Sequence, residues 1–384
     1  MIYLDAASTA KYSSVDDIIV DTITTTMRDN WQNPSSLYAS NIKEKISKCR
    51  ANIAKFIKAN PDEIYFTSGA SESNNWAIKG FVDYWNKKGL TPYIITTSIE
   101  HKSIMSCVNN LSNADFCIVD VDNEGFVDLQ QLNTILRYNR SFTFNNIVLV
   151  SIQLANNEIG TIQPIKKIAE MSHKYGAILH VDATQAFGHI PIDVKDLGID
   201  LMSASGHKVS PVLRGIGFLY KKNGINIHPL IYGAQENGLR GGTENTYGII
   251  GLNKAIEYCD ISKEKIDEIC EKRDFFIKLL ESKFGCKLNG HKDCRLPNNV
   301  NVAFPQNITG ESLLYMLDMS GVKVSTGSAC NSKSIESSYV LKAIGLNDQD
   351  AMKTIRFSLS DDITYKDIYF IIEEIEKAIK IIEA

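Results

Sequence analysis

Short apolar runs alternate with segments of helical periodicity along the first two thirds of the chain. Buried strands are predicted by the apolar runs at 64–67, 93–97, 116–119, 147–152, 177–181 and 199–202. Between them, apolar residues spaced three or four positions apart predict helices over 41–57, 76–85, 129–136 and 164–175. Strands and helices that alternate with short connections are typical of a doubly wound, mostly parallel α/β sheet.

The pattern changes after about residue 260. A charged helix is predicted over 262–284, and a last helix over about 365–382 carries isoleucines on one face. Short strands near 299–304, 321–325 and 354–359 fall between them. We expect a large α/β domain over 16–259 and a smaller α+β domain made of 1–15 together with 260–384. No Pro/Ser-rich linker separates the two parts, so we expect them to pack closely.

Composition narrows the class of protein. The 384 residues carry a formal net charge of −4, which does not call for direct binding of nucleic acid or of an anionic membrane. No apolar run reaches membrane-spanning length, and the first residues lack a basic region followed by an apolar stretch. The eight cysteines are scattered without a C-x-x-C pair, so no metal site is expected. These features predict a cytoplasmic enzyme with reduced thiols.

Two neighbouring strand ends carry complementary charges. Asp182 ends the apolar run at 177–181, and Lys208 closes a Ser/Gly turn that follows the run at 199–202. Ligands of parallel α/β sheets bind outside the carboxyl ends of the strands, so both side chains are expected in one crevice. A lysine and a carboxylate there suit pyridoxal phosphate, because the lysine holds the aldehyde and the acid keeps the pyridine nitrogen protonated. Taken alone, Lys208 is better explained as an ordinary surface lysine, because lysines are mostly exposed; the other features described below favour the cofactor site.

Two further features lie beside predicted strand ends. A Ser- and Gly-containing turn over 68–75 precedes the helix expected at 76–85, where backbone N–H groups and the helix dipole attract anions. Simple N-capping of the helix explains the same residues. His101 follows the run at 93–97, where it is either a functional imidazole or a core histidine.

Cys330 lies in a small, polar loop at about 325–336 that precedes a helix expected near Ser337. Cysteine reactivity requires access and thiolate character, which a loop supplies more readily than an apolar segment does. Cys107 and Cys117, by contrast, lie in apolar patterns. An incidental loop thiol remains the alternative for Cys330.

Taken together, the chain resembles the cysteine desulfurases of the NifS/IscS type, which are class V aminotransferases of pyridoxal phosphate (PLP) fold type I. The similarity runs from the segment at 3–5 to the segment at 355–359. It is carried by NPSS at 33–36, TSGASESNN at 67–75, EHK at 100–102, NNEIG at 156–160, HVDATQ at 180–185, SGHK at 205–208, QENGLRGGTEN at 235–245 and GSAC at 327–330. The length of the cysteine loop resembles the group that passes sulfur to several acceptors.

The resemblance implies roles for residues around the cofactor ring. Lys208 would form the Schiff base and then move the proton at the substrate Cα. Asp182 would pair with the pyridinium nitrogen, and His101 would stack on the ring and assist proton transfer. Gln185 and Asn157 would hydrogen-bond the region of the ring oxygen.

The remaining implied roles concern the phosphate and the substrate. The backbone of Ala70 and the side chains of Ser71, Ser205 and His207 would hold the cofactor phosphate. Thr243 would reach the phosphate of a partner subunit, so the resemblance implies a homodimer. Arg356 would bind the substrate carboxylate, together with Asn157, through its planar fork; an ordinary ion pair in a strand is the alternative.

The implied reaction converts L-cysteine into L-alanine. Cys330 would attack the substrate sulfur, carry it as a persulfide and pass it to an acceptor protein, either an iron–sulfur scaffold or an enzyme of tRNA or DNA thiolation. Two other functions stay open: a different PLP-dependent lyase or aminotransferase, or a degenerate scaffold that binds sulfur-relay proteins.

The sequence departs from the family pattern at several points. Family members have a Gly-Pro-Lys-Gly-like turn after the lysine, whereas this chain has a longer, more apolar turn over 209–215. Tyr38 replaces a usual histidine, and Gly233-Ala234 replaces a triple glycine. The N-terminal motif is also altered, to Asp5-Ala6-Ala7-Ser8-Thr9-Ala10. None of these changes removes a predicted catalytic group, and together they indicate a divergent branch.

Overall fold

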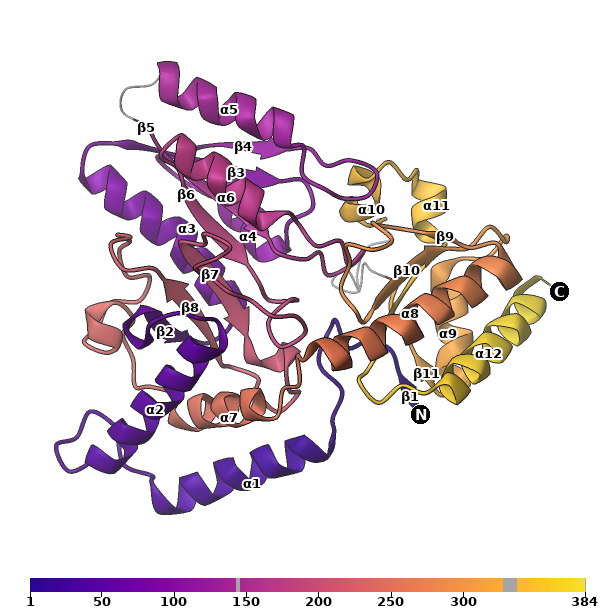
Figure 1. Ribbon diagram of the computed structural model, residues 1–384, viewed down its shortest axis with the longest axis horizontal. Helices are drawn as coiled ribbons and strands as arrows, with labels where there is room; N and C mark the ends of the chain where they lie inside the picture. Colours follow the sequence, from indigo (N-terminus) through magenta and orange to yellow (C-terminus); the bar gives the residue numbers. More distant parts are fainter. Residues whose placement is uncertain (143–145, 327–336, 384) are drawn as a thin grey trace.

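The computed structural model describes residues 1–142, 146–326 and 337–383. Its larger part is built around one sheet with the strand order β2-β8-β7-β6-β5-β3-β4 (Figure 1). The strands are β2 (Ile64–Thr67), β3 (Thr91–Thr97), β4 (Asp115–Val119), β5 (Asn146–Gln153), β6 (Ile178–Asp182), β7 (Leu201–Ser205) and β8 (Gly217–Lys221). Neighbouring strands from β4 to β7 are parallel, whereas β8 runs antiparallel to both β7 and β2. The predicted mixed, mostly parallel sheet is therefore confirmed.

Successive residues of each strand enter two different cores. Tyr65, Ile94 and Leu149 pack on one face with α3 (Ala70–Lys87) and α4 (Lys102–Asn109). Their neighbours, such as Phe66 and Ile95, pack on the other face. That face is covered by α1 (Ser14–Asp29), α2 (Ser40–Phe56), α5 (Leu129–Phe142), α6 (Ile165–Lys174) and α7 (Thr246–Glu257). Period-two alternation of the strands thus produces a sheet buried between two helical layers.

The smaller part has its own apolar core, which includes Leu4, Phe276, Val300, Phe357 and Ile375. An antiparallel sheet of order β12-β10-β9 packs against long helices (Figure 1). Its elements are α8 (Lys263–Phe284), β9 (Lys287–Leu288), β10 (Asn299–Ala303), α9 (Gly310–Met319), β11 (Val322–Lys323), α10 (Tyr339–Ala343), α11 (Asp348–Met352), β12 (Thr354–Ser358) and α12 (Tyr365–Glu383). The separate cores support the division into 16–259 and 1–15 with 260–384, which stays a proposal.

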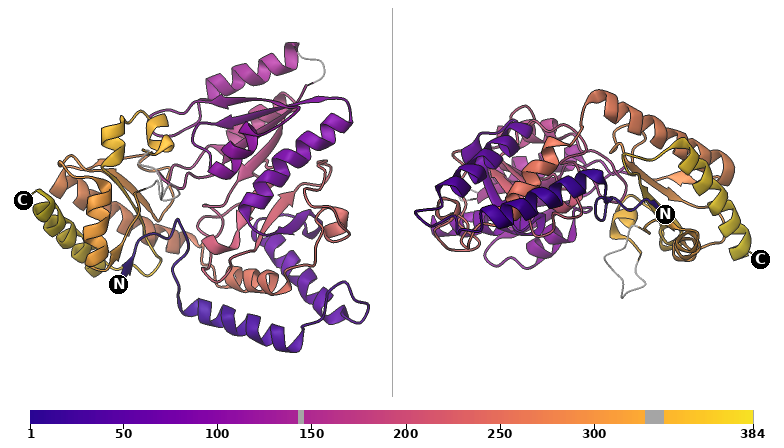
Figure 2. Two further views of the ribbon diagram at one scale, coloured as in Figure 1. Left: turned by 180° about the vertical axis from the view of Figure 1, so that it is seen from behind. Right: turned by 90° about the horizontal axis from the view of Figure 1, so that it is seen from below.

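The first residues of the chain belong to the small part and then cross to the large one (Figure 2). Strand β1 (Ile2–Tyr3) pairs in parallel with β11, and the Ser358 N–H donates to the Leu4 carbonyl at 2.7 Å. The chain then enters α1 at Ser14. The segment between β1 and α1 consequently lies at the junction of the two parts.

Two local predictions were inaccurate. Helix α3 begins at Ala70 rather than at Trp76, so that all of the 68–75 motif from residue 70 onward is helical. Helix α1 and strand β8 had no predicted counterpart. Among the described residues, no helix combines the length and apolar character needed to cross a membrane.

Candidate active site

A cavity of about 510 Å³ opens at the carboxyl ends of β6 and β7. It lies where the sheet register places Gln153, Asp182 and Ser203 side by side on β5, β6 and β7. Ten of the predicted site residues line it: Ala70, Ser71, His101, Asn157, Asp182, Gln185, Ser205, His207, Lys208 and Arg356. Residues scattered from position 70 to position 356 in the sequence therefore meet in one cavity.

Two predicted residues are not part of this lining. Thr243 is exposed and does not line the cavity of its own chain. Cys330 lies outside the described residues, as does most of the predicted loop at 325–336. The two ends of that loop are nevertheless placed. Ser325 exchanges backbone hydrogen bonds with Arg356, and the Ser338 hydroxyl donates to the Glu158 carboxylate at 2.5 Å.

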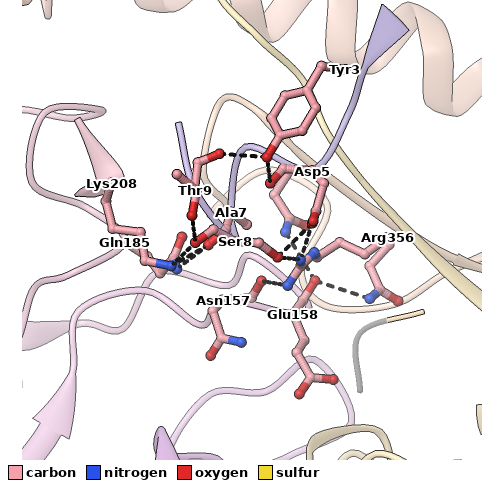
Figure 3. A network of polar contacts seen from close by, with 12 residues as sticks. Tyr3, Asp5, Ala7, Ser8, Thr9, Asn157, Glu158, Gln185, Lys208 and Arg356 are labelled. Carbon is pink, nitrogen blue, oxygen red and sulfur yellow. Dashed lines mark hydrogen bonds and ion pairs between the residues drawn. The ribbon is translucent and has the colours of Figure 1, made fainter. Parts of the chain in front are cut away.

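Lys208 ends a short 3-10 turn over Gly206–Lys208 that continues directly from β7. Its Nζ donates to the carbonyls of Ala7 at 2.6 Å and Ser8 at 2.9 Å (Figure 3). Gln185 Nε2 donates to the same Ala7 carbonyl at 3.0 Å. The amine thus lies inside the cavity, where hydrogen bonds from the N-terminal segment hold it.

Asp182 ends β6 and is 5% exposed. Its Oδ2 accepts from Asn74 Nδ2 at 2.8 Å, and its Oδ1 accepts from the Thr184 N–H at 3.0 Å and from the Thr184 hydroxyl. Asn74 Nδ2 also donates to the Ser103 hydroxyl at 2.9 Å. These hydrogen bonds fix the orientation of the carboxylate, which can pair with a cationic ring nitrogen.

His101 is the N-cap of α4, because its Nδ1 accepts from the Ser103 N–H at 3.1 Å. An Nδ1 that accepts leaves the proton of the neutral ring on Nε2. Desolvation by the surrounding protein lowers the pKa of His101, the nearby Lys208 charge lowers it further, and Asp182 opposes both. The ring is thus held neutral in a fixed tautomer beside Asp182 and Lys208.

An anion cradle lies between β2 and α3. The first N–H groups of a helix have no internal partner, and here they face the cavity at Ala70 and Ser71. Gly69 precedes them with φ of 151°, a conformation that L side chains rarely adopt. Ser205 Oγ lies 2.8 Å from His207 Nδ1, and burial lowers the pKa of His207 to about 4. Backbone amides, hydroxyls and a neutral imidazole therefore offer donors to a phosphate.

Arg356 lies on β12, at the opposite wall of the cavity, and is 3% exposed. Its Nη2 donates to Asp5 Oδ1 at 2.6 Å and to Ser8 Oγ at 2.9 Å, and its Nη1 donates to the Asn157 carbonyl at 3.1 Å (Figure 3). Its Nε has no partner among the described residues although it is buried. A buried unpaired donor is costly, so this nitrogen is a natural contact for an incoming anion.

The apolar turn over 209–215 packs into the core. Leu213 is 1% exposed, and its side chain would collide with a Cβ placed on Gly251 of α7. Val209 and Val212 also contact the large core. The departure from the family's Gly-Pro-Lys-Gly-like turn thus supplies a packing contact beneath the lysine and leaves Lys208 in the cavity.

A larger hollow of about 760 Å³ lies elsewhere, between the ends of α2 and α7 and the segment 191–197. It contains none of the predicted site residues. Chemistry rather than size therefore identifies the candidate site.

Sequence reasoning assigned no role to several residues that complete the site. Asn74 and Thr184 hold Asp182, and Asp5, Ala7 and Ser8 contact the two cations. Asn74 belongs to the 67–75 motif and Thr184 to the 180–185 motif, so the motifs contained the signal. The N-terminal residues carry no local signal for this role, because Arg356 lies 351 positions from Asp5.

Comparison with known proteins agrees with this geometry. The model of the aminotransferase class-V family matches residues 2–370. The chain is 41% identical to a protein of Dictyoglomus turgidum named cysteine desulfurase IscS, over 99% of this chain and 94% of that protein. Among solved structures, a NifS-like protein matches with a TM-score of 0.88 at 32% identity over 99% of both chains.

A second solved structure, described as SspA in complex with cysteine, matches with a TM-score of 0.80 at 32% identity. It covers 94% of this chain, and 99% of that chain is matched. Family model, sequence relatives and solved structures thus agree along nearly the whole length. The chain belongs to the cysteine desulfurases of the class-V aminotransferase family, which are pyridoxal phosphate-dependent enzymes.

Proposed function

We propose that this protein converts L-cysteine into L-alanine with bound pyridoxal phosphate and transfers the sulfur to Cys330 as a persulfide. The observation that carries the proposal is the convergence of Lys208, Asp182 and Arg356 on one cavity. The cavity offers an amine for the aldehyde, a carboxylate for the ring nitrogen and a cation for the substrate carboxylate. The relatives named cysteine desulfurase direct the choice among reactions of this cofactor.

The residues present fit the cofactor. The first turn of α3, with Ser71, Ser205 and His207, suits a phosphate, and hydrogen bonds from Asn74 and Thr184 orient Asp182 for a ring nitrogen. His101 lines the same cavity and can cover the ring. When bound, pyridoxal phosphate supplies an aldehyde that condenses with amines and a ring that withdraws electrons from the substrate Cα.

The chain's own groups then perform the chemistry. Arg356 Nε and Asn157 bind the substrate carboxylate, and the Lys208 amine removes the proton from the substrate Cα. The Cys330 thiolate attacks the substrate sulfur, so that a sulfur–sulfur bond forms while the Cβ–S bond breaks. The electron pair of the broken bond stays with Cβ, which takes up a proton to become a methyl group, and the return of a proton to Cα completes L-alanine. No external oxidant or reductant is needed.

The protein is proposed to act as a homodimer. Thr243 is exposed and lies outside the cavity of its own chain, so the phosphate contact implied by the resemblance requires a second copy. Trp31 and Tyr232 are each 70% exposed and are available for such an interface. Sedimentation velocity of the holoenzyme should give the mass of two chains.

The sulfur acceptor is proposed to be a protein, either an iron–sulfur scaffold or an enzyme of tRNA or DNA thiolation. The protein is proposed to act in the cytoplasm. All seven cysteines in the described part of the chain are free thiols, which suits a reducing compartment.

Two variants separate the proposed function from its alternatives. Lys208→Ala should abolish the visible absorbance of the bound cofactor, whereas the exposed control Lys79→Ala should keep it. Cys330→Ala should keep that absorbance and lose release of sulfide and L-alanine from L-cysteine, whereas Cys294→Ala should release both at the wild-type rate.

Each alternative has its own outcome. A protein without cofactor absorbance would be a scaffold. A coloured protein that released no sulfide from L-cysteine would perform other cofactor chemistry. Sulfide release by Cys330→Ala at the wild-type rate would contradict the persulfide step.

A further inference from the structure

One short stretch of the chain, which we call the N-terminal turn and define as Asp5–Thr9, contacts both cations of the candidate site (Figure 3). Its Ala7 and Ser8 carbonyls accept from Lys208 Nζ, and its Asp5 carboxylate and Ser8 hydroxyl accept from Arg356 Nη2. Both cationic side chains line the cavity. The turn is therefore part of the site.

The N-terminal turn is held by its own hydrogen bonds. The Tyr3 hydroxyl donates to the Asp5 carbonyl at 3.2 Å and to the Thr9 carbonyl at 2.9 Å. The Ser8 N–H donates to the Asp5 carbonyl at 3.0 Å, and the Ser8 hydroxyl donates to Asp5 Oδ1 at 2.8 Å. Asp5 also forms a β-bridge with Ser358, the last residue of β12. The Asp5 carboxylate consequently has a defined place relative to Arg356.

The position of Asp5 on the Arg356 guanidinium determines which nitrogens can donate hydrogen bonds to a substrate carboxylate. A carboxylate binds arginine with two parallel hydrogen bonds, either side-on to Nε and Nη2 or end-on to Nη1 and Nη2. Both forks contain Nη2. In this structure Nη2 contacts Asp5 Oδ1 and Ser8 Oγ, while Nε has no partner among the described residues. A two-pronged contact with a substrate carboxylate, through either fork, therefore requires displacement of an acceptor from Nη2.

The negative charge of Asp5 also opposes binding of a substrate carboxylate to Arg356. The Arg356 side chain is 4% exposed and the Asp5 side chain is 23% exposed, so the pair is only weakly screened by solvent. Asp5 already neutralises Arg356, and an incoming carboxylate meets the Asp5 charge across the same nitrogen. The affinity for a substrate carboxylate therefore depends on how much more favourably Arg356 interacts with it than with the Asp5 carboxylate.

We propose that Asp5 competes with the substrate carboxylate for Arg356, and that its negative charge sets how tightly the site holds L-cysteine and L-alanine. This inference rests on the proposed function, because it takes Arg356 as the carboxylate-binding group. Substrate and product carry the same carboxylate, so weakening the charge of Asp5 tightens both complexes equally. Such uniform binding lowers KM without raising kcat.

The test is Asp5→Asn in the holoenzyme. Asparagine keeps an oxygen that accepts from Nη2 and removes the charge, so the arginine stays in place while the competition weakens. The Kd of L-alanine, measured by titration calorimetry, and the KM of L-cysteine should both fall roughly three- to tenfold. The kcat and the Kd of pyridoxal phosphate should stay as in the wild type.

Two controls isolate the carboxylate. Cysteamine has the amine and thiol of cysteine without the carboxylate, and its Kd should be the same for Asp5→Asn and the wild type. Asp362→Asn removes an exposed carboxylate that pairs with Lys11 at 2.6 Å, and it should leave L-alanine binding unchanged. Ser8→Ala frees one contact of Nη2 without changing charge, and it should tighten L-alanine binding by a smaller factor. It also keeps the test valid if Asp5→Asn does not fold.

Different results contradict different statements. If the folded Asp5→Asn holoenzyme bound L-alanine as the wild type does or more weakly, Asp5 would be a support for Arg356 and the proposed competition would be wrong. Equal tightening of cysteamine would also refute it. A wild-type holoenzyme that bound L-alanine but released no sulfide from L-cysteine would contradict the proposed function alone.

Discussion

Two buried arginines contact the same turn, residues 157–159, and are used in opposite ways. Arg295 is 2% exposed and Arg356 is 3% exposed, and each donates to a backbone carbonyl of the segment 157–159. Arg295 makes further hydrogen bonds only to neutral oxygens, those of His291, Asn289 and Asn299. Arg356 pairs with the Asp5 carboxylate, and its buried Nε has no hydrogen-bond partner among the described residues.

The difference separates a structural arginine from a binding one. Carbonyls and an amide oxygen surround Arg295 without an ion pair, and burial together with the nearby Arg273 charge lowers its pKa to about 9. All three of its nitrogens have partners, so it ties the segment 289–299 to the large part of the molecule. Arg356 keeps a donor unpaired at the expense of stability, which is what a ligand site requires.

The largest expected effect is on folding. Arg295→Ala should leave several buried carbonyls without donors and should lower the free energy of unfolding by about 3–5 kcal/mol. Urea unfolding of the cofactor-free protein measures the loss. A loss below about 1 kcal/mol would mean that the surrounding oxygens find water, and that Arg295 does not tie the two parts together.

Arg356→Lys should have the opposite effect, a large loss of activity with little loss of stability. Lysine keeps a cation for Asp5 but has no planar fork, so kcat/KM for L-cysteine should fall roughly 100-fold while the urea midpoint changes little. Steady-state kinetics and unfolding of the same preparation check both halves. Unfolding as severe as that of Arg295→Ala would remove the contrast between the two arginines.

Glu158 lies in the same turn, between the residues whose carbonyls accept from Arg356 and Arg295, and among the described residues it forms an ion pair with neither arginine. Burial raises its pKa to about 7 against the opposing effects of the Ser338 hydrogen bond and the Arg356 charge, and burial raises the pKa of Glu100 to about 8. The folded state therefore holds protons that the unfolded state has lost, so stability should fall as pH rises from about 4.5 to about 8. In Glu158→Gln, the free energy of unfolding should fall by roughly 1–3 kcal/mol less than in the wild type as the pH rises from about 4.5 to about 7. Thermal unfolding at a series of pH values measures the slope.

A smaller effect on the free energy of unfolding is expected for Ser338, the hydrogen-bond partner of Glu158. Ser338 caps α10 by accepting from the N–H groups of Val340 and Leu341, and its hydroxyl donates to Glu158. Ser338→Ala should cost about 1 kcal/mol, while Ser337→Ala, whose hydroxyl bonds the exposed Asp348, should cost less than about 0.5 kcal/mol. Equal losses would show that the contact with Glu158 adds no stability.

The sequence predicted the parts of the fold that local patterns encode. The strands at 64–67 and 147–152 and the helix at 41–57 lie within a residue or two of β2, β5 and α2. Helix α1 has no predicted counterpart because threonines and β-branched residues lower its helix propensity, and packing against α7 stabilises it instead. The early start of α3 was hidden by Ser and Asn residues, which favour caps and turns as readily as helices.

In the candidate site, too, features encoded by local patterns were predicted and features set by long-range contacts were not. Asp182 and Lys208 were placed together by a general rule about strand ends, without any knowledge of their contacts. The roles of Asp5 and Ser8 could not be predicted, because they depend on the pairing of β1 with β11 and on a bridge between Asp5 and Ser358. Long-range register of this kind has no local signal in a single sequence.

The pairing of β1 has a consequence for synthesis of the protein. Ile2 and Tyr3 pair with Val322 and Lys323, and the Leu4 carbonyl accepts from Ser358. On the ribosome, Ile2–Tyr3 emerge long before Val322–Lys323, so they must wait for their partner strand before they reach their final place. The large sheet can fold early, whereas the wall formed by Asp5–Thr9 closes only after β11 and β12 have been made, so a nascent chain can bind amino acids through Arg356 only after that point.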